Sequence, residues 1–528
     1  MLVTLWVTLY TPVAAIYEFV LRLLLEILLK VFNHIPERFK RCNQAMLELG
    51  NKIMGIKLKA VLSAAILFCL ALNACSDAAV NNDTVNSVKA VQEHVSLSPE
   101  LKTLIDTAME GTHGYDITRE LTTEVGPRLA GTDAEARARD WAVDKFKELG
   151  LQNVRIEPFT IPGWVRGVET ASILSPYPQD LYITALGGSV ATPDEGVKAE
   201  IAYFPTFEDL ESAPEGGLEG KIVFISGKME KAPDGAGYGP ANRKRRSGAT
   251  EAGRRGAIAV VIRSVGTDSH RFPHTGQMRY SPDVKPIPIG ALSAPDADQL
   301  ERMLTSGETV SLHLTMTPRA VGDLPSGNVV GEIVGTERPE EIVLISGHLD
   351  SWDLGTGAID DGAGIGISAG AAQVLIESGL KPKRTIRVVA FGAEEVGLLG
   401  GFAYAEHHKN DLINHVLATE SDFGAGLVYE VQSGAKAGNE VIEAMAKAMG
   451  LPMSQTPTNG GPDIFPLFNK GVPAMRFQQD GTDYFDLHHT PDDTFDKIKP
   501  EEMAQNVAAF ATMIWLAGNA ETNFRLED

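Results

Sequence analysis

The sequence predicts an α/β protein with a mixed, mostly parallel sheet between helices, interrupted by an inserted β-rich unit. After residue 327, apolar strand patterns alternate with helical ones, as in residues 342–346, 361–378 and 385–391. Strands that alternate with helices form parallel sheets covered on both faces. Between residues 168 and 326 the chain instead carries short β-rich runs with many Gly and Pro residues, which indicates a separate unit.

Length and composition set limits on the function. The 528 residues allow about two to four domains. A net charge of −22 argues against a nucleic-acid partner, which requires a basic face. The three cysteines exclude a disulfide framework and a four-cysteine zinc site, so any metal ligands must be His, Asp and Glu.

Residues 1–74 are predicted to be a leader. Residues 54–59 form a short basic segment, residues 60–72 are apolar but too short to span a bilayer comfortably, and Cys75 follows Leu72-Asn-Ala. This pattern resembles the lipobox of bacterial lipoproteins and implies lipidation of Cys75. The alternative is an ordinary secretory signal with an incidental cysteine.

The resemblance to lipoproteins also implies a location. Ser76 after the lipidated cysteine favours the outer membrane of the cell envelope, facing the periplasm or the exterior. The true start is either Met1 or Met54, and in the second case residues 1–53 come from an over-extended reading frame. Residues 75–97 are polar and are expected to be a tether.

The elements before the insertion follow in order. Residues 98–150 have a helical pattern that Gly126-Pro127-Arg128 breaks into two pieces, and residues 153–159 alternate as a strand. Residues 98–167 are therefore expected to form the first part of the catalytic unit. In the insertion, strands are predicted at 221–226 and 257–262, and the basic run at 243–246 is expected to be a solvated surface loop.

The second part of the catalytic unit is expected at residues 327–522. Besides the elements named above, it contains a helical pattern at 398–409, a strand at 415–418 and a closing helix at 500–519.

Acidic and histidine clusters follow the predicted strands of this second part. They are His348-Leu-Asp350, Asp360-Asp361, Glu394-Glu395, Glu420-Ser-Asp422 and His488-His489. Sites in open α/β sheets collect at the C-terminal ends of strands. Two histidines, three carboxylates and a further glutamate suit a hydrolytic centre with two zinc ions.

Each cluster alone also has a structural explanation. His348 alone is explained as a surface histidine, Asp360-Asp361 as a helix cap, and Glu394-Glu395 as favourable charge at a helix N-terminus. The functional interpretation makes His348 a ligand whose tautomer Asp350 fixes. Asp360 then bridges two metals, and the glutamate pair divides into one ligand and one general base.

The order of these residues resembles that of the co-catalytic zinc exopeptidases, which include bacterial leucyl aminopeptidases, glutamate carboxypeptidase II and carboxypeptidase Q. The match looks closest to the carboxypeptidase Q type and spans residues 99–519. It rests on six motifs, namely Gly126-Pro-Arg-Leu-Ala-Gly, Glu157-Pro-Phe, Trp164-Val-Arg-Gly, Glu420-Ser-Asp422, Gly471-Val-Pro473 and His488-His489.

The resemblance implies two zinc ions per chain and a role for each residue. One zinc is held by His348, Asp360 and Asp422, and the other by Asp360, Glu395 and His489, with Glu420 as the alternative to Asp422. Glu394 is the general base, and Asp350 contacts the metal ligands rather than the metal ions. The insertion, residues 168–326, resembles a protease-associated domain, which in relatives covers the active site.

The implied activity is hydrolysis of short peptides or dipeptides, and a homodimer is expected from the resemblance alone. The sequence does not identify which peptide terminus is recognised, so an aminopeptidase proper is an alternative. A one-zinc acyltransferase of the glutaminyl cyclase type and a non-catalytic receptor-like protein are further alternatives.

Overall fold

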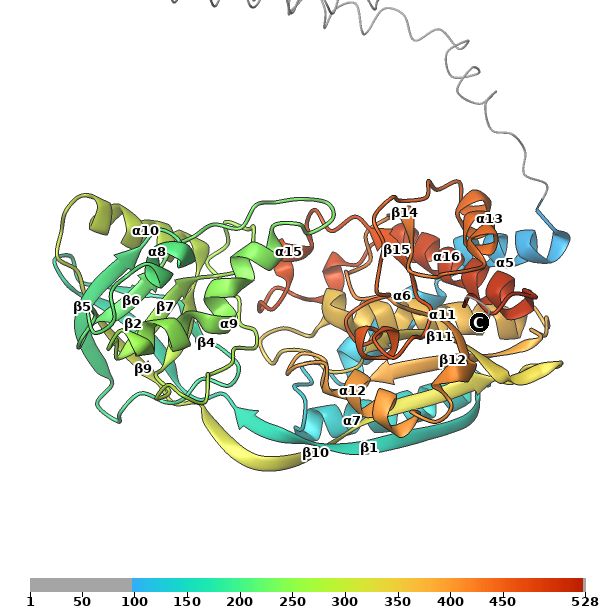
Figure 1. Cartoon of the computed structure of the whole chain (residues 1–528), viewed down its shortest axis with the longest axis horizontal. Helices are drawn as coiled ribbons and strands as arrows, with labels where there is room; N and C mark the ends of the chain where they lie inside the picture. Colours follow the sequence, from blue (N-terminus) through green and yellow to red (C-terminus); the bar gives the residue numbers. More distant parts are fainter. Residues whose placement is uncertain (1–96, 526–528) are drawn as a thin grey trace, which may run out of the picture. The chain divides into compact units, whose positions relative to one another are not determined.

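The computed structural model describes residues 97–525, which form an α/β fold built on two large sheets (Figure 1). The leader, Cys75 and nearly all of the tether lie outside the described residues. Within residues 97–525, no helix is both long and apolar enough to cross a membrane.

The first sheet has five strands in the order β1-β10-β12-β11-β13. Their bounds are Gln152–Val165, Arg319–Ile333, Arg384–Phe391, Arg338–His348 and His415–Glu420. The sheet is mixed, as predicted, but the expected parallel majority is wrong. β11 pairs in parallel with β12 and β13, whereas β10 pairs antiparallel with β1 and β12. The physical reason is that β1 leads into the insertion and β10 leads out of it. The chain therefore runs back beside β1 in the opposite direction.

Helices cover both faces of this sheet (Figure 1). Val343 and Ile345 of β11 belong to the core that includes five helices, α5, α6, α7, α11 and α16, with bounds Pro99–Glu110, His113–Glu124, Asp133–Glu148, Ala363–Glu377 and Pro500–Asn519. Ile342 and Leu344 point to the opposite core, which includes α12 (Leu399–His407) and α14 (Phe465–Phe468). This alternation is the period of two expected of a strand buried on both faces.

The first helical segment has one more break than the sequence predicts. Residues 98–150 form three helices, because the chain also leaves the helix at Gly111 and Thr112. Side chains of Ser98 and Thr132 cap α5 and α7 by accepting backbone N–H groups. The predicted closing helix at 500–519 is confirmed as α16.

α11 lies against α6 at very short range. Its Gly366 and Gly370 face Gly114 of α6, where a methyl group at either position would lie within 3.0 Å of the Gly114 backbone. The Gly/Ala-rich sequence of α11 therefore lets this helix pack closely beside the chain that carries Asp360. A short π-helical turn, η2 (Ala358–Gly362), leads into it.

The second sheet has eight strands in the order β3-β2-β9-β5-β6-β7-β8-β4. Their bounds are Gln179–Leu181, Glu169–Ser175, Ser311–Met316, Val197–Phe204, Ile222–Ile225, Ala259–Arg263, Ile289–Leu292 and Ile183–Ala185. One face packs with α8 (Phe207–Glu211) and α9 (Tyr238–Arg254), the other with α10 (Ala294–Thr305). β1 and β10 are the two strands that connect it to the first sheet.

The basic run at 243–246 is not a solvated loop, and that prediction is wrong. It lies inside α9, where Lys244 and Arg245 are buried. Arg243 pairs with Glu208 and Glu211, and the Lys244 ammonium donates to the Gly227 carbonyl at 2.7 Å. The helical turn points consecutive residues in different directions, so a run that is continuous in sequence is divided among different environments.

The remaining elements lie around the C-terminal half. β14 (Val428–Ser433) and β15 (Met475–Gln479) form an antiparallel pair. The other helices and turns are η3 (Leu412–Asn414), α13 (Asn439–Met449), α15 (Tyr484–Leu487) and η4 (Phe495–Lys497).

Candidate metal centre

Three neighbouring strands deliver the predicted site residues to one edge of the first sheet. β11 ends at His348, β12 ends three residues before Glu394, and β13 ends two residues before Asp422. Because β12, β11 and β13 are parallel neighbours, their carboxyl ends meet at the same edge. The α/β pattern in the sequence therefore leads directly to this convergence.

The first ligand group consists of His348, Asp360 and Asp422. The Nε2 atom of His348 lies 3.0 Å from Asp360 Oδ1 and 3.6 Å from Asp422 Oδ1. One ligand atom from each of the three lies within 4.8 Å of the others. His348 is fully buried, and its Nδ1–H donates to the backbone carbonyl of Asp350 at 2.9 Å, which leaves Nε2 to face the carboxylates.

The second ligand group shares Asp360 with the first. The Nε2 atom of His489 lies 3.2 Å from Asp360 Oδ2 and 3.0 Å from Glu395 Oε2. His488 also reaches this group, with its Nε2 3.7 Å from Asp360 Oδ2 and its ring stacked on His489. His489 touches two carboxylates and His488 one at longer range, so the geometry favours His489 as the ligand.

The donor set fits cations. Asp360 Oδ2 and Glu395 Oε1 are buried oxygens without a hydrogen-bond donor among the described residues. Burial and the neighbouring Asp360 raise the pKa of Glu395 to about 7. Burial opposes the charge on His489, but Glu395 and Asp360 raise its pKa to about 9. Two bound divalent cations would neutralise these carboxylates and replace the imidazole protons.

Asp350 acts on the glutamate pair more directly than on His348. Its carboxylate accepts the backbone N–H of Glu394 at 3.0 Å and that of Glu395 at 3.3 Å. The contact from its Oδ1 to His348 Nδ1 is 3.7 Å, too long for a hydrogen bond. The tautomer of His348 is thus held by the Asp350 carbonyl, while the Asp350 side chain holds the loop that presents Glu394.

Glu420 and Asp422 point to different partners. Glu420 Oε2 accepts the backbone N–H of Asp463 at 2.7 Å, and Glu420 belongs to no ligand group of the described residues. Asp422 lies in the first group and lines the cleft. The structure therefore brings Asp422, not Glu420, to His348 and Asp360.

Two residues that the sequence analysis did not assign to the site fix the backbone before Asp360. The Arg128 guanidinium is fully buried and donates to the carbonyls of Leu349, Thr356 and Gly357. Asp493 Oδ1 accepts the N–H groups of Ala358 and Ile359, both at 2.8 Å. Both residues belong to motifs visible in the sequence, Gly126-Pro-Arg and His-His-Thr-Pro-Asp-Asp, but their partners are distant in the chain.

A loop of the insertion holds the segment that carries His489. The Thr275 carbonyl accepts from His489 Nδ1 at 3.3 Å, and the Thr275 N–H donates to the His489 carbonyl at 3.1 Å. The Nδ1 atom of buried His274 lies 2.7 Å from the His488 carbonyl oxygen, and its Nε2 lies 2.7 Å from Asp268 Oδ1. No pattern in the sequence linked residues 268–275 to the site.

The candidate metal ligands open into a cleft of about 500 Å³, which is lined by residues of the C-terminal part and of the insertion. Glu394, Glu395, Asp360, Asp422 and His489 line one part of it. The same cleft is lined by four arginines, Arg245, Arg246, Arg279 and Arg476. Among the described residues, none of these four forms an ion pair, although the whole chain carries a net charge of −22.

Comparison with known proteins gives consistent results. The model of "Peptidase family M28" matches residues 328–514. Human carboxypeptidase Q is 34% identical over 459 residues, which cover 85% of this chain and 96% of that protein.

Solved structures are also similar. The crystal structure of a peptidase M28 precursor from Shewanella amazonensis SB2B is 47% identical, with a TM-score of 0.79, and the match covers 81% of this chain and 97% of that one. A zinc aminopeptidase from Bacillus subtilis shares the fold at 24% identity and a TM-score of 0.58, over 76% of this chain and 94% of its own.

Proposed function

The chain belongs to peptidase family M28 and is a carboxypeptidase Q-like metallo-exopeptidase, and we propose that it cleaves short peptides, dipeptides above all, with two zinc ions. The observation that carries this proposal is the pair of ligand groups that share Asp360 at the cleft. The family match and the identity with carboxypeptidase Q confirm the resemblance that the sequence predicted.

We assign His348, Asp360 and Asp422 to one zinc and Asp360, Glu395 and His489 to the other. Nitrogen and carboxylate ligands suit zinc, and a shared carboxylate is the arrangement expected of a two-metal hydrolytic site. When bound, the two ions supply Lewis acidity, which lowers the pKa of a water and polarises the scissile carbonyl.

Glu394 is the group that moves the proton in this proposal. It lines the cleft beside Glu395 without being part of either ligand group. Burial, together with Asp422 and Glu395, raises the pKa of Glu394 well above its usual range, which makes its carboxylate a stronger base than an ordinary glutamate. Glu394 takes the proton of the attacking water and delivers it to the leaving amine nitrogen.

The four arginines that line the cleft support recognition of a free carboxylate. Guanidinium groups bind carboxylates through paired hydrogen bonds, and Arg245 Nε is a buried donor without a partner in residues 97–525. A dipeptide can place its carboxylate among the arginines and its ammonium near the acidic groups while its one peptide bond lies at the zinc ions. A longer peptide would have no terminal carboxylate at this position and would have to bury uncharged backbone against the arginines.

We also propose that the insertion is a protease-associated domain that contributes to substrate binding. Its α9 supplies Arg245 and Arg246 to the cleft, and the segment after β7 supplies Arg279. The catalytic part of the cleft holds the ligand carboxylates. The insertion adds the cationic groups that a zwitterionic substrate also needs.

The proposal is tested with a panel of dipeptides on the zinc-loaded protein, with each terminus free or blocked. We expect hydrolysis of dipeptides with both termini free, loss of activity with a chelator, and a large loss on amidation of the C-terminus. Tolerance of amidation together with loss on N-acetylation would instead show an aminopeptidase proper.

A matched variant separates metal binding from proton transfer. Glu394→Gln keeps the side-chain shape and is expected to keep both zinc ions while lowering kcat by about 10²–10⁴-fold. Two bound zinc ions with no cleavage anywhere in the panel would contradict the peptidase proposal, and one zinc per chain would favour the acyltransferase alternative.

The anchor remains a proposal from the sequence. We propose that Cys75 is lipidated and holds the enzyme in the cell envelope, with the outer membrane as the expected site. Cys75→Ser should release the protein from the membrane fraction, whereas an unchanged distribution would contradict the anchor. The expected homodimer is tested by the molar mass in solution.

A further inference from the structure

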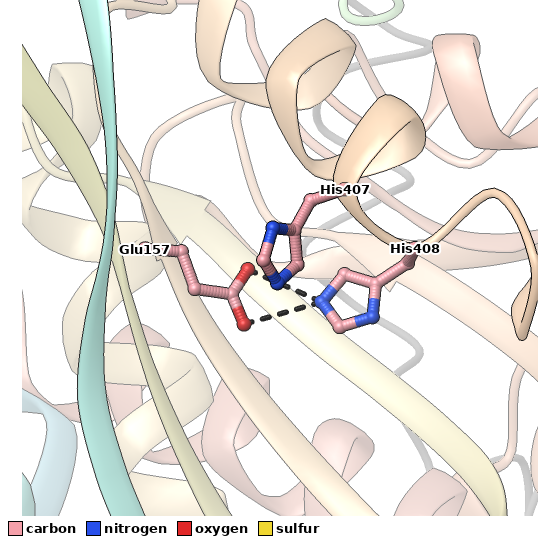
Figure 2. A group of neighbouring side chains, drawn as sticks. All are labelled: Glu157, His407 and His408. Atoms are coloured by element: carbon pink, nitrogen blue, oxygen red, sulfur yellow. Dashed lines mark hydrogen bonds and ion pairs between the residues drawn. The ribbon is translucent and has the colours of Figure 1, made fainter.

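A second group of metal-ligating side chains lies outside the catalytic cleft, where α12 meets β1 (Figure 2). Glu157 lies on β1, and His407 and His408 lie at the end of α12. One ligand atom from each of the three lies within 4.8 Å of the others. None of them lines the cleft that holds the catalytic ligands.

The end of the helix allows two consecutive histidines to face one carboxylate. Adjacent residues inside a helix do not face the same direction. α12 ends at His407, however, and His408 has φ −96° and ψ 14°, outside the regular helix. Figure 2 shows both imidazole rings directed toward the Glu157 carboxylate.

His408 is oriented as a metal ligand would be. Its Nδ1 lies 3.1 Å from Asp411 Oδ2, and its Nε2 lies 3.1 Å from both oxygens of Glu157. A histidine ligand usually donates its other N–H to a carboxylate, which fixes the tautomer and makes the ligating nitrogen more basic. Asp411 provides this acceptor, so Nε2 is the atom left to hold either a proton or a metal ion.

The local charge also suits a cation. The Glu157 carboxylate is buried, and its close charged or titratable partners are the His408 ring and the Arg155 guanidinium. Arg155 Nη2 binds Glu157 Oε1 at 2.6 Å and leaves Oε2 free of the guanidinium. Glu157 and Asp411 together carry two negative charges against the one positive charge of Arg155.

We propose that Glu157, His407 and His408 bind one divalent transition-metal ion, in addition to the catalytic pair. Two imidazoles and a carboxylate with an open fourth position form a donor set typical of zinc. Glu157 and His408 are buried while His407 is exposed, which gives the ion a path from solvent. On binding, the ion ties α12, which follows the Glu394 loop, to β1, which leads to the insertion.

Zinc titration of the full chain, followed by native mass spectrometry, tests the proposal. We expect wild type to bind one more zinc than His407→Ala, whose exposed side chain can be removed without opening the core. Glu157→Gln should lose the same equivalent. The matched control is His313→Ala on β9, which belongs to no metal-ligating group of the described residues and should bind as many zinc ions as wild type.

The difference between variants makes this result independent of the catalytic proposal, because the catalytic pair contributes equally to all of them. Dipeptide hydrolysis by His407→Ala should equal that of wild type. Equal zinc content in wild type and His407→Ala would overturn the site and leave Glu157 and His408 as a simple ion pair. Loss of zinc from His313→Ala as well would show non-specific binding and would overturn it equally.

Discussion

Asp350→Asn is the sharpest test of how the fold presents Glu394, the proposed general base. The Asp350 carboxylate is fully buried and accepts the N–H groups of both Glu394 and Glu395. Asparagine keeps the shape but offers one oxygen, so its amide N–H₂ faces the second backbone donor. One hydrogen bond to a charged group is lost, which lowers the free energy of unfolding by about 2 kcal/mol.

The same change should act on kcat more than on KM. A misplacement of about 1 Å in a reacting group costs about 100-fold, so we expect kcat to fall by about 100-fold with KM within about twofold of wild type. Urea unfolding, steady-state hydrolysis of a dipeptide and elemental zinc analysis measure the three effects. Asp209→Asn is the matched control, because it alters the same atoms in the cap of α8 and should leave kcat unchanged.

Two results would refute this reasoning. If Asp350→Asn retains wild-type kcat with both zinc ions bound, the side chain does not position Glu394. If it loses zinc while the activity per bound zinc stays normal, Asp350 acts through His348, as the sequence first indicated.

Four further predictions follow from the site and its surroundings. Arg128→Met should lower the free energy of unfolding by at least about 3 kcal/mol in urea, because two buried carbonyls and a partly buried one lose their donor. An effect below about 1 kcal/mol would contradict this. His274→Gln should lower zinc content toward one equivalent by loosening the His489 segment, and two retained equivalents would count against it. Chelation should lower the thermal midpoint, since buried carboxylates lose their cations; an unchanged midpoint would argue against bound metal. The pKa of Glu157 is ordinarily 4.5 and falls to about 2 in the folded protein, so its ionised form stabilises the fold above pH 4.5. This contribution, about 3 kcal/mol, is lost as the pH falls toward 2. In the presence of a chelator, Glu157→Gln should therefore lose less stability than wild type between pH 5 and 2.5.

The part of the site that the sequence could predict is the part carried by strand ends. An apolar run that ends at or within three residues of His348 or Glu394 places these side chains at a sheet edge, whichever neighbours the strands have. Their convergence then required only that β12, β11 and β13 be parallel neighbours, which the alternation of strands and helices implied.

The contacts that the sequence could not predict join segments distant in the chain. Arg245 reads as part of a basic run, and only the helical turn of α9 together with the docking of the insertion brings its Nη1 within 3.4 Å of His489 Nδ1. The parallel majority failed for a related reason. Local patterns do not show that β1 and β10 return along one another at the edge of the sheet.

On the proposed assignment, the insertion contributes to both metal binding and substrate binding. Its Thr275 and His274 hold the backbone and ring of the His488–His489 segment, while its Arg245 faces the same cleft as the catalytic carboxylates. A catalytic part without the insertion would keep His348, Asp360 and Asp422 on their own elements but would lose the partners that orient His489. Removal of the insertion should consequently impair the proposed second metal position as well as substrate binding.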